Sequence, residues 1–211
     1  MPIIKTVKPN QDTVLAIWKI TETIENLLAQ VDFNKYDQAS YDVITHDEKK
    51  LEWLCSRLTI RYLVEKTGKK YKGIIKDKHK KPYLKDINYH LSISHSFPYA
   101  AAIIHKTNPV GIDIEMPRKK IERISKRFLS DVELEAANEN IEVLSIYWSA
   151  KETLYKIYGK KKLIFRKNIE VLAFEMSDEG EIEGIIKIDD EVTTYTLRFL
   201  KIDNHYLVYS L

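Results

Sequence analysis

The stretch "PVGIDIE" at residues 109–115 places two acids in an otherwise apolar run. Asp113 and Glu115 are two residues apart, and alternate residues of a β-strand point to the same side. Both carboxylates would therefore aim at one spot, with Ile112 and Ile114 facing the core. Two carboxylates held close together repel each other unless a cation neutralises them. The stretch predicts either a strand end where both acids face water or a site for a positively charged group.

A second segment, "YWSAKETLYK" at residues 147–156, has the pattern of a helix and carries another acid. Trp148, Glu152 and Lys156 are spaced by four residues, so they share one helical face. Standing alone, Glu152 and Lys156 would be a surface ion pair worth about 0.3–0.5 kcal/mol. Lys151 lies on a neighbouring face, where water would solvate it equally well. The segment nevertheless supplies a third carboxylate that a suitable fold would bring to the first two.

The composition is that of a soluble, folded protein. Of 211 residues, 44% are hydrophobic and 31% are charged, with a formal net charge of only +3. The one cysteine, Cys55, excludes an intrachain disulfide and a multi-cysteine zinc site. The N-terminus has no signal-peptide hydrophobic region, and no apolar run approaches the ~20 residues of a membrane span. We therefore expect a cytoplasmic protein without a membrane partner.

Helix and strand patterns occur in both halves of the chain. Strands are predicted at residues 12–20, 89–96, 99–105 and 110–115, and in four segments of the C-terminal tail. The last three of the numbered strands predict an antiparallel meander. Long helices are predicted at residues 46–68, with one apolar stripe, and at about 141–158, closed by Gly159. We expect an α+β fold of two similar subdomains, residues 1–106 and 107–211. Each would be a mainly antiparallel sheet packed with a long helix, related by a pseudo-twofold.

Two further features of the sequence indicate candidate binding sites: a serine–histidine segment and clusters of basic residues. In "SISHS" (92–96), Ser94 and His95 satisfy a turn or contact an anion, and no acid in the segment completes a hydrolase triad. Basic residues cluster in segments 66–85, 117–127 and 160–167. These clusters are solvated faces or binding surfaces for a polyanion or an acidic protein.

Taken in order, five segments have a recognisable arrangement: "EWLCSRLTIRYLV", "KKPYL", "SISHS", "GIDIE" and "WSAKETLYK". This order resembles that of the 4′-phosphopantetheinyl transferases, of the longer, two-subdomain type that modifies the carrier proteins of synthases. The family pattern is G-x-D-[IV]-E followed by W-x-x-K-E-x-x-x-K, and residues 111–115 and 148–156 match it position for position. The resemblance spans roughly residues 46–160.

The resemblance implies an activity. Such enzymes transfer phosphopantetheine from coenzyme A to a serine of an apo acyl or peptidyl carrier protein and release adenosine 3′,5′-bisphosphate. Asp113, Glu115 and Glu152 would hold Mg²⁺, with diphosphate oxygens and waters completing its six ligands. Glu152 would also be the general base, and Lys156 would donate to the diphosphate. The active site would form where the two subdomains meet, so a monomer would suffice.

The resemblance also implies contacts with coenzyme A. They would come from Arg57, Lys81, Ser94, His95, Lys151 and Lys156. Lys49 and Lys50 stand where relatives carry a cation that reaches the nucleotide. Carrier proteins are acidic, and the basic segment 117–127 would meet the carrier helix that follows the modified serine.

Three alternatives remain open. A metal-dependent nuclease uses acids and a lysine on adjacent strands, whereas Lys151 and Glu152 lie in a predicted helix. A non-catalytic nucleic-acid-binding protein needs ordered, exposed aromatic residues for base stacking, and only Tyr71 and Tyr83 accompany the lysines of segment 69–84. A non-catalytic relative would lack a motif residue, and none is missing. We therefore expect no nucleic-acid partner.

Overall fold

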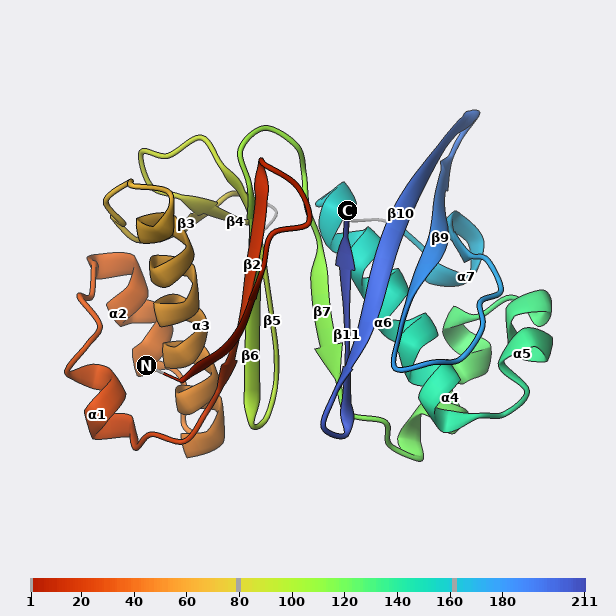
Figure 1. Cartoon of the computed structure of the whole chain (residues 1–211), viewed down its shortest axis with the longest axis horizontal. Helices are drawn as coiled ribbons and strands as arrows, with labels where there is room; N and C mark the ends of the chain where they lie inside the picture. The colour runs from red at the N-terminus through yellow and green to blue at the C-terminus, as the bar shows by residue number, and fades with distance from the viewer. Residues whose placement is uncertain (1, 79–80, 161–162) are drawn as a thin grey trace. The chain divides into compact units, whose positions relative to one another are not determined.

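The computed structural model describes residues 2–78, 81–160 and 163–211, which fold as two compact units, Met1–Val110 and Gly111–Leu211 (Figure 1). Each unit combines an antiparallel sheet with helices, which confirms the expected α+β class. The boundary predicted after residue 106 and the pseudo-twofold relation stay predictions. Lys80, Lys161 and Lys162 of the basic clusters lie outside the described residues.

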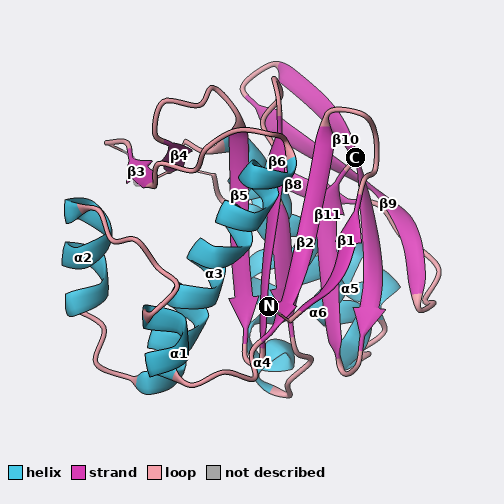
Figure 2. Cartoon of the chain, turned by 60° about the vertical axis from the view of Figure 1, so that its left-hand side comes forward, coloured by secondary structure: helices cyan, strands magenta, loops and turns pink. Residues whose placement is uncertain are grey.

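The first unit is built on a four-stranded antiparallel sheet with the order β1-β2-β6-β5. Its strands are β1 (Ile3–Val7), β2 (Thr13–Lys19), β5 (His90–Ser96) and β6 (Tyr99–His105). One long helix, α3 (Asp47–Lys66), packs on this sheet and contacts β2, β5 and β6 (Figure 2). The smaller elements of the unit are α1 (Ile24–Leu28), α2 (Lys35–Asp42), β3 (Ile74–Lys76) and β4 (Pro82–Leu84).

Helix α3 confirms the predicted helix, but its burial extends beyond the predicted apolar stripe. Polar residues are also buried on it, namely Glu52, Ser56, Arg57 and Thr59. The sheet covers one side of α3, and α1 covers another together with Phe33, whose ring stacks on Trp53 of α3. Periodicity of apolar residues therefore identified the helix and underestimated how much of it is enclosed.

The second unit contains a five-stranded antiparallel sheet with the order β7-β11-β10-β9-β8. Its strands are β7 (Ile112–Glu115), β8 (Ile169–Val171), β9 (Glu179–Ile188), β10 (Glu191–Ile202) and β11 (His205–Ser210). Its helices are α4 (Lys120–Phe128), α5 (Asp131–Ala137), α6 (Ile141–Tyr158) and α7 (Phe165–Asn168). The predicted three-strand meander is wrong in its last member, because β7 pairs with β11 while β5 and β6 pair in the other sheet.

Local signals account for the ends of the helices that carry the motifs. The Asn140 side chain accepts hydrogen bonds from the first turn of α6, and Gly159 ends that helix with φ +67°. Ser130 and Glu133 form a capping box at the start of α5. None of the helices in the described residues is both long and apolar enough to cross a bilayer.

Candidate active site

The two motif segments meet because β7 and α6 approach each other closely. A Cβ at Gly111 would lie 2.2 Å from the backbone oxygen of Thr153, so only glycine permits this approach. One turn further along α6, the Lys156 ammonium donates to the Ile112 carbonyl at 2.9 Å and to Asp113 Oδ1 at 2.7 Å. The glycine of the first motif and the last lysine of the second therefore hold the same helix–strand contact.

The acids of β7 share one face of the strand, as predicted, and that face is turned towards helix α6. Asp113 lies opposite Val208 of β11 and Glu115 opposite Tyr206, and paired residues of neighbouring strands share a face. Val208 and Tyr206 belong to the hydrophobic core around α6. The neighbouring isoleucines of β7 are fully buried on the other face of the sheet. The predicted burial of Ile112 and Ile114 is confirmed, and the acidic side of β7 lies against the core around α6.

The three motif carboxylates interact with one another. Burial first and the charge of Asp113 second raise the pKa of Glu115 to about 7, against the opposing effects of Lys156, Arg118 and a Trp148 hydrogen bond. Burial and the charge of Asp113 likewise raise the pKa of Glu152 to about 6. These carboxylates therefore lie near one another in a place that favours added positive charge.

The same residues fit a divalent cation by their chemistry. All three side chains offer oxygen, the ligand that Mg²⁺ prefers, and their mutual repulsion would be relieved by a dication. Among the described residues, no three His, Cys, Asp or Glu side chains stand in an arrangement ready to hold a metal. The cation that contacts Asp113 is the Lys156 ammonium. Metal binding would thus require these side chains to rearrange.

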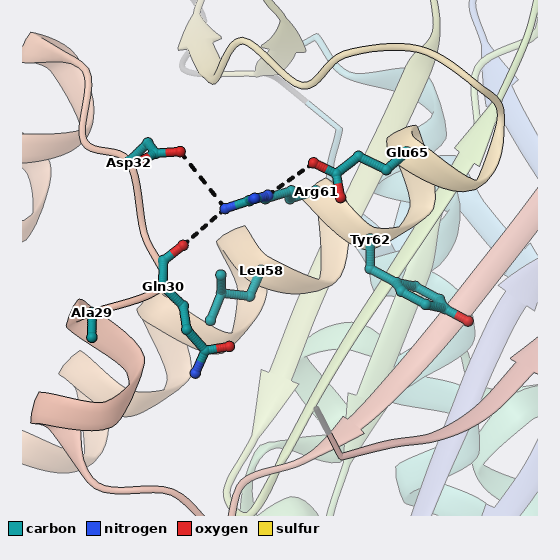
Figure 3. Close-up of a pocket in the computed structure, with 7 residues that line it drawn as sticks. All are labelled: Ala29, Gln30, Asp32, Leu58, Arg61, Tyr62 and Glu65. Atoms are coloured by element: carbon teal, nitrogen blue, oxygen red, sulfur yellow. Dashed lines mark hydrogen bonds and ion pairs between the residues drawn. The ribbon is translucent and has the colours of Figure 1, made fainter.

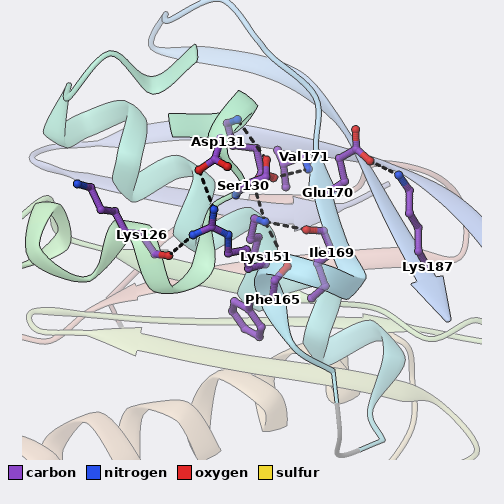
Figure 4. A network of polar contacts seen from close by, with 11 residues as sticks. Lys126, Ser130, Asp131, Lys151, Phe165, Ile169, Glu170, Val171 and Lys187 are labelled. Atoms are coloured by element: carbon purple, nitrogen blue, oxygen red, sulfur yellow. Dashed lines mark hydrogen bonds and ion pairs between the residues drawn. The ribbon is translucent and has the colours of Figure 1, made fainter. Parts of the chain in front are cut away.

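Lys151, predicted to contact coenzyme A, has a structural environment instead. Its side chain is 0% exposed and pairs with Glu133 at 2.8 Å. Its ammonium also donates to the carbonyl oxygens of Ile169 at 2.7 Å and Phe165 at 3.3 Å (Figure 4). These three acceptors match the three hydrogens of an ammonium. The arrangement is incompatible with the predicted phosphate contact. Glu133 was not predicted, because it lies 18 residues before Lys151 and no local pattern links the two.

A comparison with known protein families gives a match to the second unit, Gly111–Leu211. The family model described as the 4′-phosphopantetheinyl transferase superfamily matches residues 109–209. This segment belongs to that superfamily. The match includes both motifs and confirms the family resemblance, and membership implies a transferase of this type. The superfamily uses coenzyme A as a substrate and typically a divalent metal. A search of the curated proteins found no match to the chain.

Predicted coenzyme A contacts also lie in the first unit, outside the segment that the family model matches. His95 of β5 faces α3, because it lies opposite Ala100 in the α3 core. Its Nδ1 is 3.1 Å from Glu52 Oε2, and its side chain is 42% exposed. Ser94 precedes it in the strand, so it points to the opposite face of the sheet, and it is buried. Only His95 of this pair reaches α3.

Lys81 lies at the other end of β5 from His95. Its charge acts on His90, the first residue of β5, and burial lowers the pKa of Lys81 itself. Five residues of strand separate His90 from His95, which corresponds to roughly 16 Å. The predicted nucleotide contacts are therefore spread along the strand, and one phosphate group would not reach both ends.

Arg57, predicted to contact a nucleotide phosphate, is paired within the fold. It is 8% exposed, its Nε donates to Asp37 Oδ1 at 3.1 Å, and its guanidinium stacks over Trp53. These contacts favour a structural role over the predicted one.

One turn later on α3, Arg61 borders a 440 Å³ pocket (Figure 3). There it contacts Glu65 and the Gln30 carbonyl.

Proposed function

We propose that this protein transfers the 4′-phosphopantetheine group of coenzyme A to a serine of an apo acyl or peptidyl carrier protein, with Mg²⁺ as cofactor. The observation that supports this best is the meeting of the two motifs. Lys156 Nζ lies 2.7 Å from Asp113 Oδ1 across 43 residues of sequence. The charge of Asp113 also acts on Glu115 and Glu152.

Asp113, Glu115 and Glu152 would hold the magnesium ion. When bound, Mg²⁺ would neutralise charge on the diphosphate of coenzyme A and so favour attack on its phosphorus. Lys156 is already held beside this acidic group, from where its ammonium would donate to the diphosphate. Lys151 is left out of this set, because Glu133 and two carbonyl oxygens occupy its hydrogens.

The reaction breaks one phosphorus–oxygen bond and forms another. The serine Oγ bonds to the phosphorus that carries the pantetheine, and the bond from that phosphorus to the bridging oxygen breaks. Adenosine 3′,5′-bisphosphate leaves with the electron pair, and the serine proton passes to Glu152.

The carrier protein would approach segment 117–127. A cavity of 220 Å³ lies beside Glu115 and is bordered by the apolar side chains of Ile121, Ile124 and Trp148 and by the basic residues Arg118 and Lys120. Arg118, Lys119 and Lys120 are exposed at the start of α4. A basic rim with an apolar floor suits an acidic carrier helix with an apolar face.

The test is the mass of the carrier. Incubation of the protein with Mg²⁺, coenzyme A and a panel of apo acyl and peptidyl carriers should add about 340 Da to at least one carrier. Glu152→Gln should lower the rate at least about 100-fold. Glu142→Gln is the matched control, because Glu142 lies on the same helix and binds Lys201 at 3.2 Å. The proposal fails if no carrier gains mass, or if Glu152→Gln works as well as Glu142→Gln.

A further inference from the structure

Helix α3 carries a buried carboxylate that no motif identifies. Glu52 is 1% exposed, and both of its oxygens are engaged. Oε1 accepts the backbone N–H of Phe97 at 3.1 Å, while Oε2 lies 2.6 Å from Lys49 Nζ and 3.1 Å from His95 Nδ1. Burial raises the pKa of Glu52, but the hydrogen bonds and charges of His95 and Lys49 outweigh it and lower that pKa to about 2. The carboxylate is therefore ionised at neutral pH.

The contact with Glu52 decides what His95 presents to a ligand. A histidine ring has two nitrogens, and a carboxylate at one of them fixes a proton there and the orientation of the ring. Because Nδ1 faces Glu52, Nε2 is the nitrogen that a ligand can reach on the 42% exposed side chain. With a proton held on Nδ1 by Glu52, the orientation of the ring directs Nε2 away from the carboxylate.

The charged groups around this carboxylate favour an anionic ligand. Lys49 comes from α3, His95 from β5, and the third contact is the neutral backbone N–H of Phe97. The side chains of Lys49 and His95 are 55% and 42% exposed, whereas that of Glu52 is 2% exposed. The Lys49 ammonium and the His95 ring thus reach solvent, and the acid that holds them does not.

We propose that Glu52 is a positioning residue, which holds His95 with Nδ1–H directed inward so that Nε2–H donates to a phosphate group of coenzyme A. The proposal rests on the transfer function proposed above. It assigns Glu52 no direct contact with the substrate.

A double-mutant cycle tests this action through His95. Glu52→Gln keeps an acceptor for the Phe97 N–H and removes the charge, and His95→Gln removes the donor ring. Each variant should raise the KM for coenzyme A roughly tenfold, the effect of losing a charge-assisted hydrogen bond. The double variant should be no worse than the poorer single one, because both changes remove the same contact. Glu65→Gln, on the same helix, should leave this KM unchanged. Additive effects in the cycle, or an unchanged KM for Glu52→Gln, would overturn the proposal.

A spectroscopic measurement separates this proposal from the transfer function. The ¹⁵N shifts of the His95 ring should show a protonated Nδ1 in the wild type and a changed proton distribution in Glu52→Gln. Addition of adenosine 3′,5′-bisphosphate should shift the Nε2 resonance of the wild type. An Nε2 resonance that does not shift when the nucleotide is added would contradict the proposal, even if the carrier is modified. If both changes in shift occur but no carrier is modified, the Glu52–His95 pairing is supported and the transfer function is contradicted.

Discussion

The Lys151 side chain shows how a residue inside a motif can serve the fold instead of the substrate. Its ion pair with Glu133 joins α6 to α5, and its bonds to Phe165 and Ile169 extend the link to α7 and β8. The next residue in the motif is Glu152. The lysine therefore fixes the helix that carries the acid.

Replacing Lys151 by Met should destabilise the protein by about 3–5 kcal/mol, because Glu133 would remain buried without its cation. Lys126→Met is the control and should change the free energy of unfolding by less than about 0.5 kcal/mol, since Lys126 is exposed. Urea denaturation measures both values. If Lys151→Met left the stability unchanged and raised the KM for coenzyme A, the structural role would be wrong. The phosphate contact predicted from the sequence would then be the better explanation.

Glu52 should make stability depend on pH in the acidic range. Its pKa in the folded protein is about 2, below the ordinary value of 4.5, so the folded state binds this proton less readily than the unfolded one. The contribution is therefore complete above pH 4.5 and is lost as pH falls towards 2. By linkage it amounts to about 3 kcal/mol.

This contribution is measured as the difference in free energy of unfolding between wild type and Glu52→Gln. The difference should be constant from pH 7 to 5 and should shrink below pH 4.5. A difference that is as large at pH 3 as at pH 7 would show that the charge of Glu52 does not stabilise the fold.

At the scale of elements, the contact between β7 and α6 decides whether the motif side chains can act together. It depends on the absence of a side chain at Gly111, where the nearest atom is a backbone oxygen that cannot turn away. A glycine leaves room for another element to come close to the strand. Only the structure identifies α6 as the partner.

Gly111→Ala should therefore move α6 away from β7, cost about 1–3 kcal/mol of stability and weaken Mg²⁺ binding. Gly184→Ala is the matched control, because its new Cβ would meet the flexible side chain of Leu154 on the same helix. Denaturation and calorimetric titration with Mg²⁺ report the two effects. Equal Mg²⁺ affinity in both variants would mean that the β7–α6 distance does not control the site.

Helix α4 should contribute to recognition of the carrier. Replacing Arg118, Lys119 and Lys120 by Glu should raise the KM for an acidic carrier about tenfold or more and leave the KM for coenzyme A near its starting value. Reversing Lys66, Lys69 and Lys70 is the control, since it changes net charge equally at another exposed site. Steady-state kinetics distinguishes the two. Equal effects on both KM values would contradict a docking surface on α4.

For the whole molecule, each of the two units has its own sheet, its own long helix and part of the predicted set of contacts. The motif carboxylates with Lys156 lie in Gly111–Leu211, and the Glu52–His95 pair lies in Met1–Val110. One chain therefore contains every residue of the proposed site.

A second copy should therefore be unnecessary for activity. We expect one species near 24.8 kDa on a calibrated sizing column. A mass near twice that value, with activity that falls on dilution, would contradict a monomeric enzyme.

The amino-acid sequence by itself determined the two long helices, most strands, the end of α6 at Gly159 and the acidic chemistry of the two motifs. These depend on periodicity, turn residues and side-chain type, which act over a few neighbouring positions. The tertiary structure alone decided that β7 leaves the meander, that its acids face α6, and that Lys151 and Arg57 have internal partners. It also brought Glu52 to the Phe97 N–H, 45 residues away. Such pairings depend on which faces become buried together, and no local pattern specifies that.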